Sequence, residues 1–196
     1  VSLDGSLATY TPDANYNGAD SFTFSVSDGE YTATADVSVT VAAVNDAPVL
    51  ATVSDVSFDE DGSGSTSLSG SDVDGDDLTY SITGGSDITA TLSGSDVSFS
   101  SPENYNGSES FTVSVTDGEY TDSQSISVTV NAVNDAPTAN AASGATNEDQ
   151  SVVVSLSGDD IDGDNLTFNL ETDATNGSVS LDGSLATYTP DANYNG

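Results

Sequence analysis

Two linker motifs and two acidic loops carry the residues that could bind a metal ion. VNDAP occupies Val44–Pro48 and Val133–Pro137, and the loops DVDGDD and DIDGDN begin at Asp72 and Asp160. Calcium prefers six to eight oxygen ligands from carboxylates, Asn side chains and backbone carbonyls. Magnesium seldom sits in a site made only of protein atoms, and zinc favours His or Cys, which this sequence lacks. These motifs therefore favour calcium.

The motifs recur at a fixed interval, which indicates a tandem repeat. NYNG begins at Asn15, Asn104 and Asn193, and the two VNDAP motifs are also 89 residues apart. Residues 1–18 are identical to residues 179–196, so two related repeats alternate. We expect the C-terminal half of one repeat in 1–43, a complete repeat in 44–132 and the N-terminal part of a third in 133–196.

Two explanations account for the incomplete repeats at the two ends. The chain is an excerpt from a longer array, or half-repeats of successive chains complete each other in a polymer. The duplicated eighteen residues favour the excerpt, because an overlap is redundant in a self-completing chain.

Alternating apolar and polar residues predict short strands joined by tight turns. Apolar and polar residues alternate in 21–27 and in 35–42, and an Asp-Gly turn lies between these segments, which predicts a β-hairpin. The same pattern returns around Asp117-Gly118. Further strands are expected at 78–82 and at the corresponding Leu166, Phe168 and Leu170. About seven strands in some ninety residues, with no helix, predict an all-β fold. The expected architecture is a tandem array of immunoglobulin-like or cadherin-like Greek-key β-sandwich domains.

This topology would place the acidic turns at the ends of each domain. Successive turns of such a sandwich alternate between its two ends, so the Val44–Pro48 linker, the Asp72 loop and the Asp117 hairpin should share one end. The first turn, which contains Glu60, should lie at the opposite end, beside the second linker. Asp-Gly loops are also good turns without a metal. However, DVDGDD holds more carboxylates than a turn requires, which favours metal binding.

The candidate metal ligands therefore form one set at each linker. The set at the first linker is Asn45, Asp46, Asp72, Asp74, Asp76, Asp117 and Glu119. The set at the second linker is Glu60, Glu109, Asn134, Asp135, Asp160 and Asp162.

The charge composition excludes several classes of partner. The chain has 33 acidic residues and no Lys, Arg or His, which gives a formal net charge of −33. Self-repulsion opposes compact packing of such a chain unless cations are bound. Nucleic acids are poor partners because phosphate recognition depends on Lys and Arg. No apolar run is long enough for membrane insertion, and disulfides are excluded because there is no Cys.

The ordered set of motifs resembles the cadherin pattern, in which a DxNDNxP-type linker joins sandwich domains. VNDAP resembles this linker, and Glu60 and Glu148 resemble the acidic residue in the first turn of a cadherin domain. The cadherin DxD pair is resembled by Asp72/Asp74 and Asp160/Asp162, and the Asp near the last hairpin by Asp28 and Asp117. The chain is most similar to the bacterial cadherin-like tandem repeats of giant secreted adhesins, which show VNDAP, DxDGD and NYNG-SF-VSDG in this order. The LDRE motif is absent, and the linker lacks the first Asp and the second Asn, which implies fewer ions per joint.

This resemblance implies calcium binding, an extracellular or bacterial cell-surface location, and a role in adhesion or in building a stalk. Our first hypothesis is a calcium-rigidified spacer whose partners are calcium and neighbouring repeats, with lateral or end-to-end self-association in a fibre. The alternative is an adhesin module that recognises a glycan or protein on another cell. An enzyme is disfavoured: paired carboxylates could serve a glycosidase, but here they recur in every repeat without His, Cys, Lys or Arg.

Overall fold

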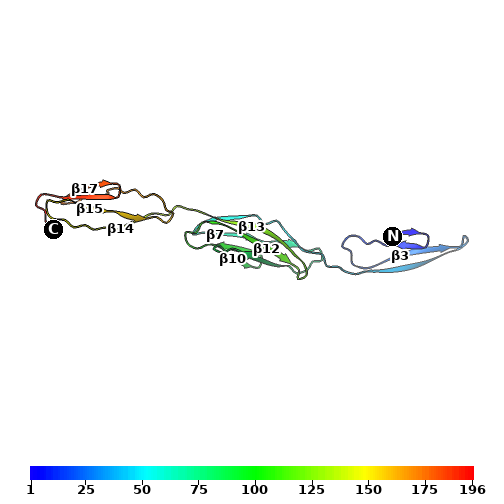
Figure 1. Ribbon diagram of the computed structural model, residues 1–196. Helices are drawn as coiled ribbons and strands as arrows, with labels where there is room; N and C mark the ends of the chain where they lie inside the picture. The colour runs from blue at the N-terminus through cyan, green and yellow to red at the C-terminus, as the bar shows by residue number, and fades with distance from the viewer. The chain divides into compact units, whose positions relative to one another are not determined.

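The computed structural model describes all residues from Val1 to Gly196 and consists of β-strands joined by loops and turns (Figure 1). It contains no helix, and therefore none long and apolar enough to span a membrane. The chain divides into two compact units, Val1–Asn131 and Ala132–Gly196. The predicted all-β class is confirmed, while the division into three repeats stays a prediction.

The first unit contains thirteen strands and the second contains five. The strands of the first unit are β1 (Ser2–Asp4), β2 (Leu7–Thr9), β3 (Gly18–Ser27), β4 (Thr32–Val41), β5 (Val49–Leu50), β6 (Val56–Asp59), β7 (Ser63–Ser67), β8 (Gly70–Ser71), β9 (Thr79–Gly84), β10 (Thr89–Ser93), β11 (Asp96–Ser100), β12 (Gly107–Thr116) and β13 (Thr121–Asn131). Those of the second unit are β14 (Thr138–Asn140), β15 (Val152–Ser155), β16 (Ser157–Asp159), β17 (Gly177–Asp182) and β18 (Leu185–Pro190).

Residues 44–131 form a complete β-sandwich. One sheet has the strand order β10-β11-β7, and the other has the order β6-β13-β12-β9. The first strand of the domain is split: β5 pairs with β8, whereas β6 runs parallel to β13. This strand exchange between sheets and the crossed strand order are the expected features of an immunoglobulin-like sandwich.

The core lies between the two sheets because alternate residues of each strand point inward. Phe111, Val113 and Val115 of β12 are no more than 1% exposed, and the polar residues between them face away from the core. The Phe99 ring of β11 meets the Phe111 ring edge to face, with centroids 5.3 Å apart. This contact joins the two sheets at the centre of the domain.

The segment before the complete domain contains two separate hairpins. Strand β1 pairs only with β2, and β3 pairs only with β4 along ten residues of each strand. The predicted turn at Asp28-Gly29 closes the second hairpin, where the Asp28 carboxylate accepts N–H bonds from Glu30 and Tyr31. The predicted hairpin is therefore confirmed.

The second unit contains the equivalents of only some strands of the complete domain. Its sheet β15-β18-β17 corresponds to β7-β11-β10, and β14 pairs with β16 as β5 pairs with β8. The predicted strand at Leu166, Phe168 and Leu170 is wrong, because these residues have no regular secondary structure. The corresponding β9 forms by pairing with β12, and no equivalent of β12 lies beside residues 166–170.

Candidate metal centre

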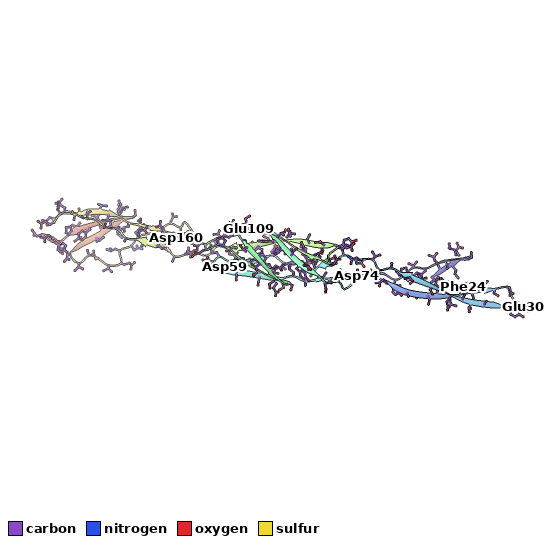
Figure 2. The ribbon with its side chains drawn as sticks, turned by 90° about the horizontal axis from the view of Figure 1, so that it is seen from below. Phe24, Glu30, Asp59, Asp74, Glu109 and Asp160 are labelled. Carbon is purple, nitrogen blue, oxygen red and sulfur yellow. The ribbon has the colours of Figure 1, made fainter.

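Three loops meet at one end of the 44–131 sandwich. The Asp72–Asp77 loop joins β8 to β9, the Asp117–Tyr120 turn joins β12 to β13, and the Val44–Pro48 linker leads into β5. Figure 2 shows Asp74 at one end of this domain, with Asp59 and Glu109 at the other. The predicted separation of the acidic turns between the two domain ends is therefore present.

The Asp72 carboxylate shapes the first acidic loop. Its Oδ1 accepts backbone N–H groups from Asp74 at 2.8 Å, Gly75 at 3.1 Å and Asp76 at 3.4 Å. Gly75 has a φ of +79°, a conformation that side-chain-bearing residues seldom adopt. The loop therefore curls around Asp72, and carboxylate oxygens of Asp72, Asp74 and Asp76 lie within 4.8 Å of one another.

The linker is attached to this loop and to the neighbouring hairpin. The Asp46 N–H donates to Asp74 Oδ2 at 2.7 Å, and Asn45 Nδ2 donates to Asp117 Oδ2 at 2.8 Å. The other oxygen of Asp117 accepts the N–H groups of Glu119 and Tyr120. Residues distant in sequence are thus brought together at one site, as predicted for the first ligand set.

The acidic cluster carries uncompensated negative charge. The pKa of Asp76 is raised, first by partial desolvation and then by repulsion from Asp72, Asp74, Asp117 and Asp77. The chain has no Lys, Arg or His to relieve this repulsion. Asp72 Oδ2 is buried and accepts no hydrogen bond. A buried carboxylate oxygen without a donor, on a residue of a carboxylate cluster, is an arrangement that a divalent cation would stabilise.

Asp117 behaves differently because hydrogen-bond donors surround it. Its pKa is lowered, chiefly by the backbone N–H of Tyr120 and further by the Asn45 amide. Asp117 therefore stays ionised beside the cluster, which adds to the local negative charge. Glu119 contributes its backbone N–H to Asp117, and a ligand role for its side chain stays a prediction.

The second linker repeats one of these contacts within its own unit. The Asp135 N–H donates to Asp162 Oδ2 at 2.7 Å, as Asp46 does to Asp74. Asp160 Oδ1 accepts the N–H of Asp164, which corresponds to one of the three N–H groups that Asp72 accepts in its loop. Asn134 Nδ2 donates to the carbonyl oxygen of Asp135. The structure brings Asp135 and Asp162 together, and metal binding at this linker stays a prediction.

Glu60 and Glu109 lie in the first unit, and their assignment to the second linker stays a prediction. Glu60, between β6 and β7, is only 6% exposed, and its N–H donates to the Asn131 carbonyl. Glu109 is a β12 residue whose two carboxylate oxygens accept the N–H groups of Ser86, Asp87 and Ile88. These bonds give Glu109 a structural role in holding the loop between β9 and β10, which the sequence analysis missed.

Two polar residues of β13 also escaped the sequence analysis. Asp122 accepts the Leu50 N–H at 2.8 Å, and Gln124 accepts the Val53 N–H at 3.1 Å. Gln124 also donates to the carbonyl oxygens of Leu50 and Ala51. These contacts fix the chain directly after the first linker. No local signal in the sequence marks these residues, because their partners are more than seventy positions away.

Glu109→Gln is expected to lower the thermal stability of the 44–131 domain at pH 7. Backbone N–H groups of Asp87, Ser86 and Ile88 hold the pKa of Glu109 below its ordinary value of 4.5. The ionised carboxylate therefore stabilises the fold above pH 4.5, and this contribution is lost as the pH falls through the lower folded-state pKa. Glutamine offers one acceptor oxygen in place of two. The melting temperatures of the variant and the unsubstituted chain should differ at pH 7 and converge in acid.

Thermal unfolding followed by circular dichroism between pH 7 and pH 3 measures this difference. Glu103→Gln removes the same charge from an exposed loop and serves as the control. Equal melting temperatures for Glu109→Gln and Glu103→Gln at pH 7 would show that Glu109 does not hold the loop.

Comparison with known domain families matches nearly the whole chain. Residues 45–129 and 134–196 match the family described as bacterial Ig domain, and residues 2–42 match the family described as cadherin-like domain. The predicted resemblance to cadherin-like repeats is confirmed for 2–42, whereas the other two segments are assigned to the bacterial Ig domain. A search of curated proteins found no match.

Several solved structures resemble the chain with low TM-scores. An endo-fucoidan hydrolase of glycoside hydrolase family 107 is 27% identical over 62% of this chain and 20% of the hydrolase, with a TM-score of 0.36. The S-layer protein rSbsC is 20% identical over 91% of this chain and 25% of its own length, with a TM-score of 0.37. Titin domains z1z2 are 12% identical over 77% of this chain and 84% of theirs, with a TM-score of 0.33. The chain thus spans less than a third of the hydrolase and of the S-layer protein. At these TM-scores the likenesses support no functional argument.

Proposed function

This chain belongs to the bacterial Ig domain family, and we propose that it is a spacer segment of a bacterial surface or secreted protein whose linkers are stiffened by calcium. The observation that carries the proposal is the Asp72, Asp74 and Asp76 cluster, whose carboxylate oxygens lie within 4.8 Å beside the linker. The residue types are those that calcium prefers, and Asp72 Oδ2 is buried without a hydrogen-bond donor.

The residues at this end divide into carboxylates that would hold the ion and groups that position them. Asp72, Asp74 and Asp76 would hold calcium, with Asn45, Asp46 and Asp117 adjoining them. Asp72 Oδ1 keeps the loop curled, and the Asp46 N–H attaches the linker to Asp74. When bound, calcium supplies the positive charge that these carboxylates lack. The linker then gains a further attachment to the domain in addition to its two hydrogen bonds.

A structural role follows from this arrangement. A linker that is attached to its domain at several points has fewer accessible orientations, because each attachment removes backbone freedom. Repeating the arrangement along an array would make a long, stiff molecule without disulfides. We extend the proposal to the second linker, where Asn134, Asp135, Asp160 and Asp162 present the same residue types. Location at the cell surface, partnership with neighbouring repeats and a role in adhesion belong to this proposal.

Calcium titration of the 196-residue protein tests the proposal. We expect calorimetry to show saturable binding, and thermal stability to rise with calcium, since a ligand at 100 times its Kd stabilises the folded state by about 2.7 kcal/mol. Small-angle scattering should show a longer and stiffer particle in calcium than in chelator. Magnesium at the same concentration and ionic strength is the control. Binding and scattering curves that are identical in calcium, magnesium and chelator would refute the proposal.

A further inference from the structure

The side of the 44–131 sandwich that contains β9 and β10 is open. Strand β9 is the last strand of one sheet and pairs only with β12, and β10 is the last strand of the other sheet and pairs only with β11. Backbone N–H and C=O groups of a strand point alternately to its two sides. Half of these groups in β9 therefore point away from β12 and have no partner strand, which makes this edge available for pairing with another chain.

A groove lies between these two edges. It has a volume of about 490 Å³, and it is lined by Leu78 and Tyr80 on the β9 side and by Leu92 on the β10 side. All three side chains pack against the core, yet they are only partly buried. The groove therefore presents apolar side chains directly beside the unpaired backbone groups of β9.

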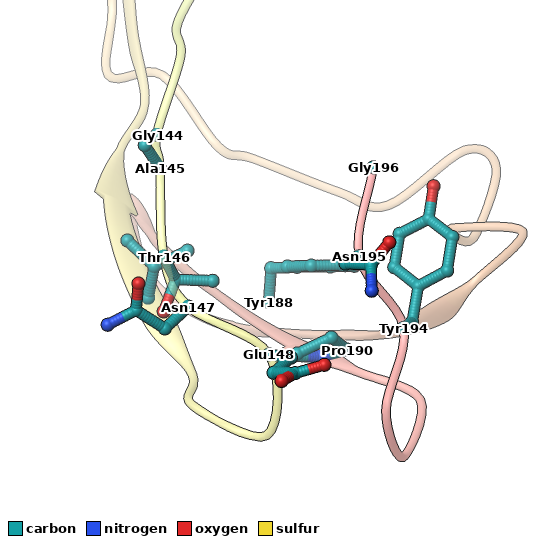
Figure 3. A pocket seen from close by; sticks show the side chains of 11 residues that line it. Gly144, Ala145, Thr146, Asn147, Glu148, Tyr188, Pro190, Tyr194, Asn195 and Gly196 are labelled. Carbon is teal, nitrogen blue, oxygen red and sulfur yellow. The ribbon is translucent and has the colours of Figure 1, made fainter.

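This combination distinguishes the groove from the larger hollow of the second unit. That hollow has a volume of about 700 Å³ and is lined mainly by loop residues, among them Asn147, Glu148 and Tyr194 (Figure 3). The groove of the 44–131 domain instead lies between two strand edges. A peptide in this groove can therefore form backbone hydrogen bonds as well as apolar contacts.

Acidic residues stand at both ends of β9. Asp77 belongs to the loop before this strand and Asp87 to the loop after it, and both side chains are exposed. Strand β9 itself, TYSITG, carries no charged residue. The chain has no Lys or Arg to pair with either carboxylate. The edge is therefore uncharged between two negative ends, and the complementary partner is an uncharged segment between two positive ends.

We propose that an extended peptide of another protein adds to β9 as a fifth strand of its four-stranded sheet. The peptide alternates apolar and polar residues along the six positions of β9 and has Lys or Arg at both ends. Its apolar side chains cover Tyr80 and Leu92, because alternate residues of an added strand face the groove. A second copy does not fit, because every copy is acidic and lacks Lys and Arg. The site is independent of calcium binding.

Hydrogen–deuterium exchange of the 196-residue protein in chelator, followed by mass spectrometry, tests the addition of a strand. The probe is the peptide Lys-Lys-Val-Thr-Val-Thr-Val-Lys-Lys with both termini blocked. We expect the probe to slow exchange of the β9 amides, because the added strand engages them. A second probe, in which Pro replaces the central Val, lacks a backbone donor and should protect β9 much less. Equal protection by the two probes, or none by the first, would overturn the proposal.

Fluorescence anisotropy of the labelled first probe tests the charge pattern, again in chelator. Asp77→Asn and Asp87→Asn should each weaken binding by about 2- to 5-fold at low salt, the usual contribution of an exposed ion pair, and by less at high salt. Asp59→Asn removes the same charge from β6, the opposite edge of the sheet, and should leave the affinity unchanged. Equal affinities for the three variants would contradict docking on β9.

A second copy as the occupant is a separate outcome of the exchange experiment. Protection of the β9 amides that rises with protein concentration, without any probe, would assign this edge to another copy and would also overturn the proposal. Because every measurement is made in chelator, failure of strand addition leaves the calcium proposal intact.

Discussion

Replacing Asp72 with asparagine is expected to weaken calcium binding at the first linker by at least about 10-fold, because substitutions of groups that merely orient ligands already cost 10–100-fold. The substitution removes one carboxylate charge from the cluster and changes the residue that shapes the loop. A 10-fold loss of affinity corresponds to about 1.4 kcal/mol of binding free energy. At a fixed saturating calcium concentration, the stabilisation of the folded protein should fall by the same amount.

Calorimetric titration and calcium-dependent thermal unfolding measure the two consequences separately. Asp87→Asn removes the same charge from an exposed residue at the other end of the domain, and it should bind calcium like the unsubstituted protein. In chelator, the Asp72→Asn protein should unfold at a temperature no lower than that of the unsubstituted protein, since the substitution relieves repulsion with Asp74 and Asp76. Equal calcium affinities for Asp72→Asn and Asp87→Asn would exclude the cluster as the binding site.

Phe111→Ala is expected to lower the free energy of unfolding of the 44–131 domain by about 3–5 kcal/mol, the usual cost of truncating a buried aromatic residue. Phe111 is 1% exposed, and its ring meets the Phe99 ring across the two sheets. The truncation leaves a cavity at the centre of the core and removes the edge-to-face contact. A domain of this size has a total stability of roughly 4–13 kcal/mol, so the loss is a large fraction of the whole.

Urea denaturation of the 196-residue protein, with and without calcium, provides the measurement. Thr112→Ala, the adjacent outward-facing position on β12, is the matched control and should change stability by less than about 0.5 kcal/mol. A loss for Phe111→Ala no greater than that for Thr112→Ala would mean that the two sheets do not share this core. The two variants therefore test the sandwich independently of any metal.

The strands of the complete domain were largely predictable because they depend on local patterns. The alternation of Phe111, Val113 and Val115 reflects the two-residue period of a strand with one buried face. The Asp-Gly turn at Asp117 is marked by residues that accept the backbone angles a tight hairpin needs. The fixed spacing of VNDAP and NYNG indicated the size of each repeat. The meeting of the first linker, the Asp72 loop and the Asp117 hairpin at one end of the domain could be predicted because the turns of such a sandwich alternate between its ends.

The contacts that complete the site depended on tertiary structure. Asp122 and Gln124 hydrogen-bond to residues 50–53, which lie more than seventy positions away in the sequence, so no local pattern predicts these contacts. Glu109 has the residue type of a metal ligand, yet three backbone N–H groups of a neighbouring loop engage its carboxylate. Leu166, Phe168 and Leu170 have the alternation of a strand and still form none. The reason is physical: a pattern determines which face of a strand is apolar, but a strand exists only where another backbone completes its hydrogen bonds.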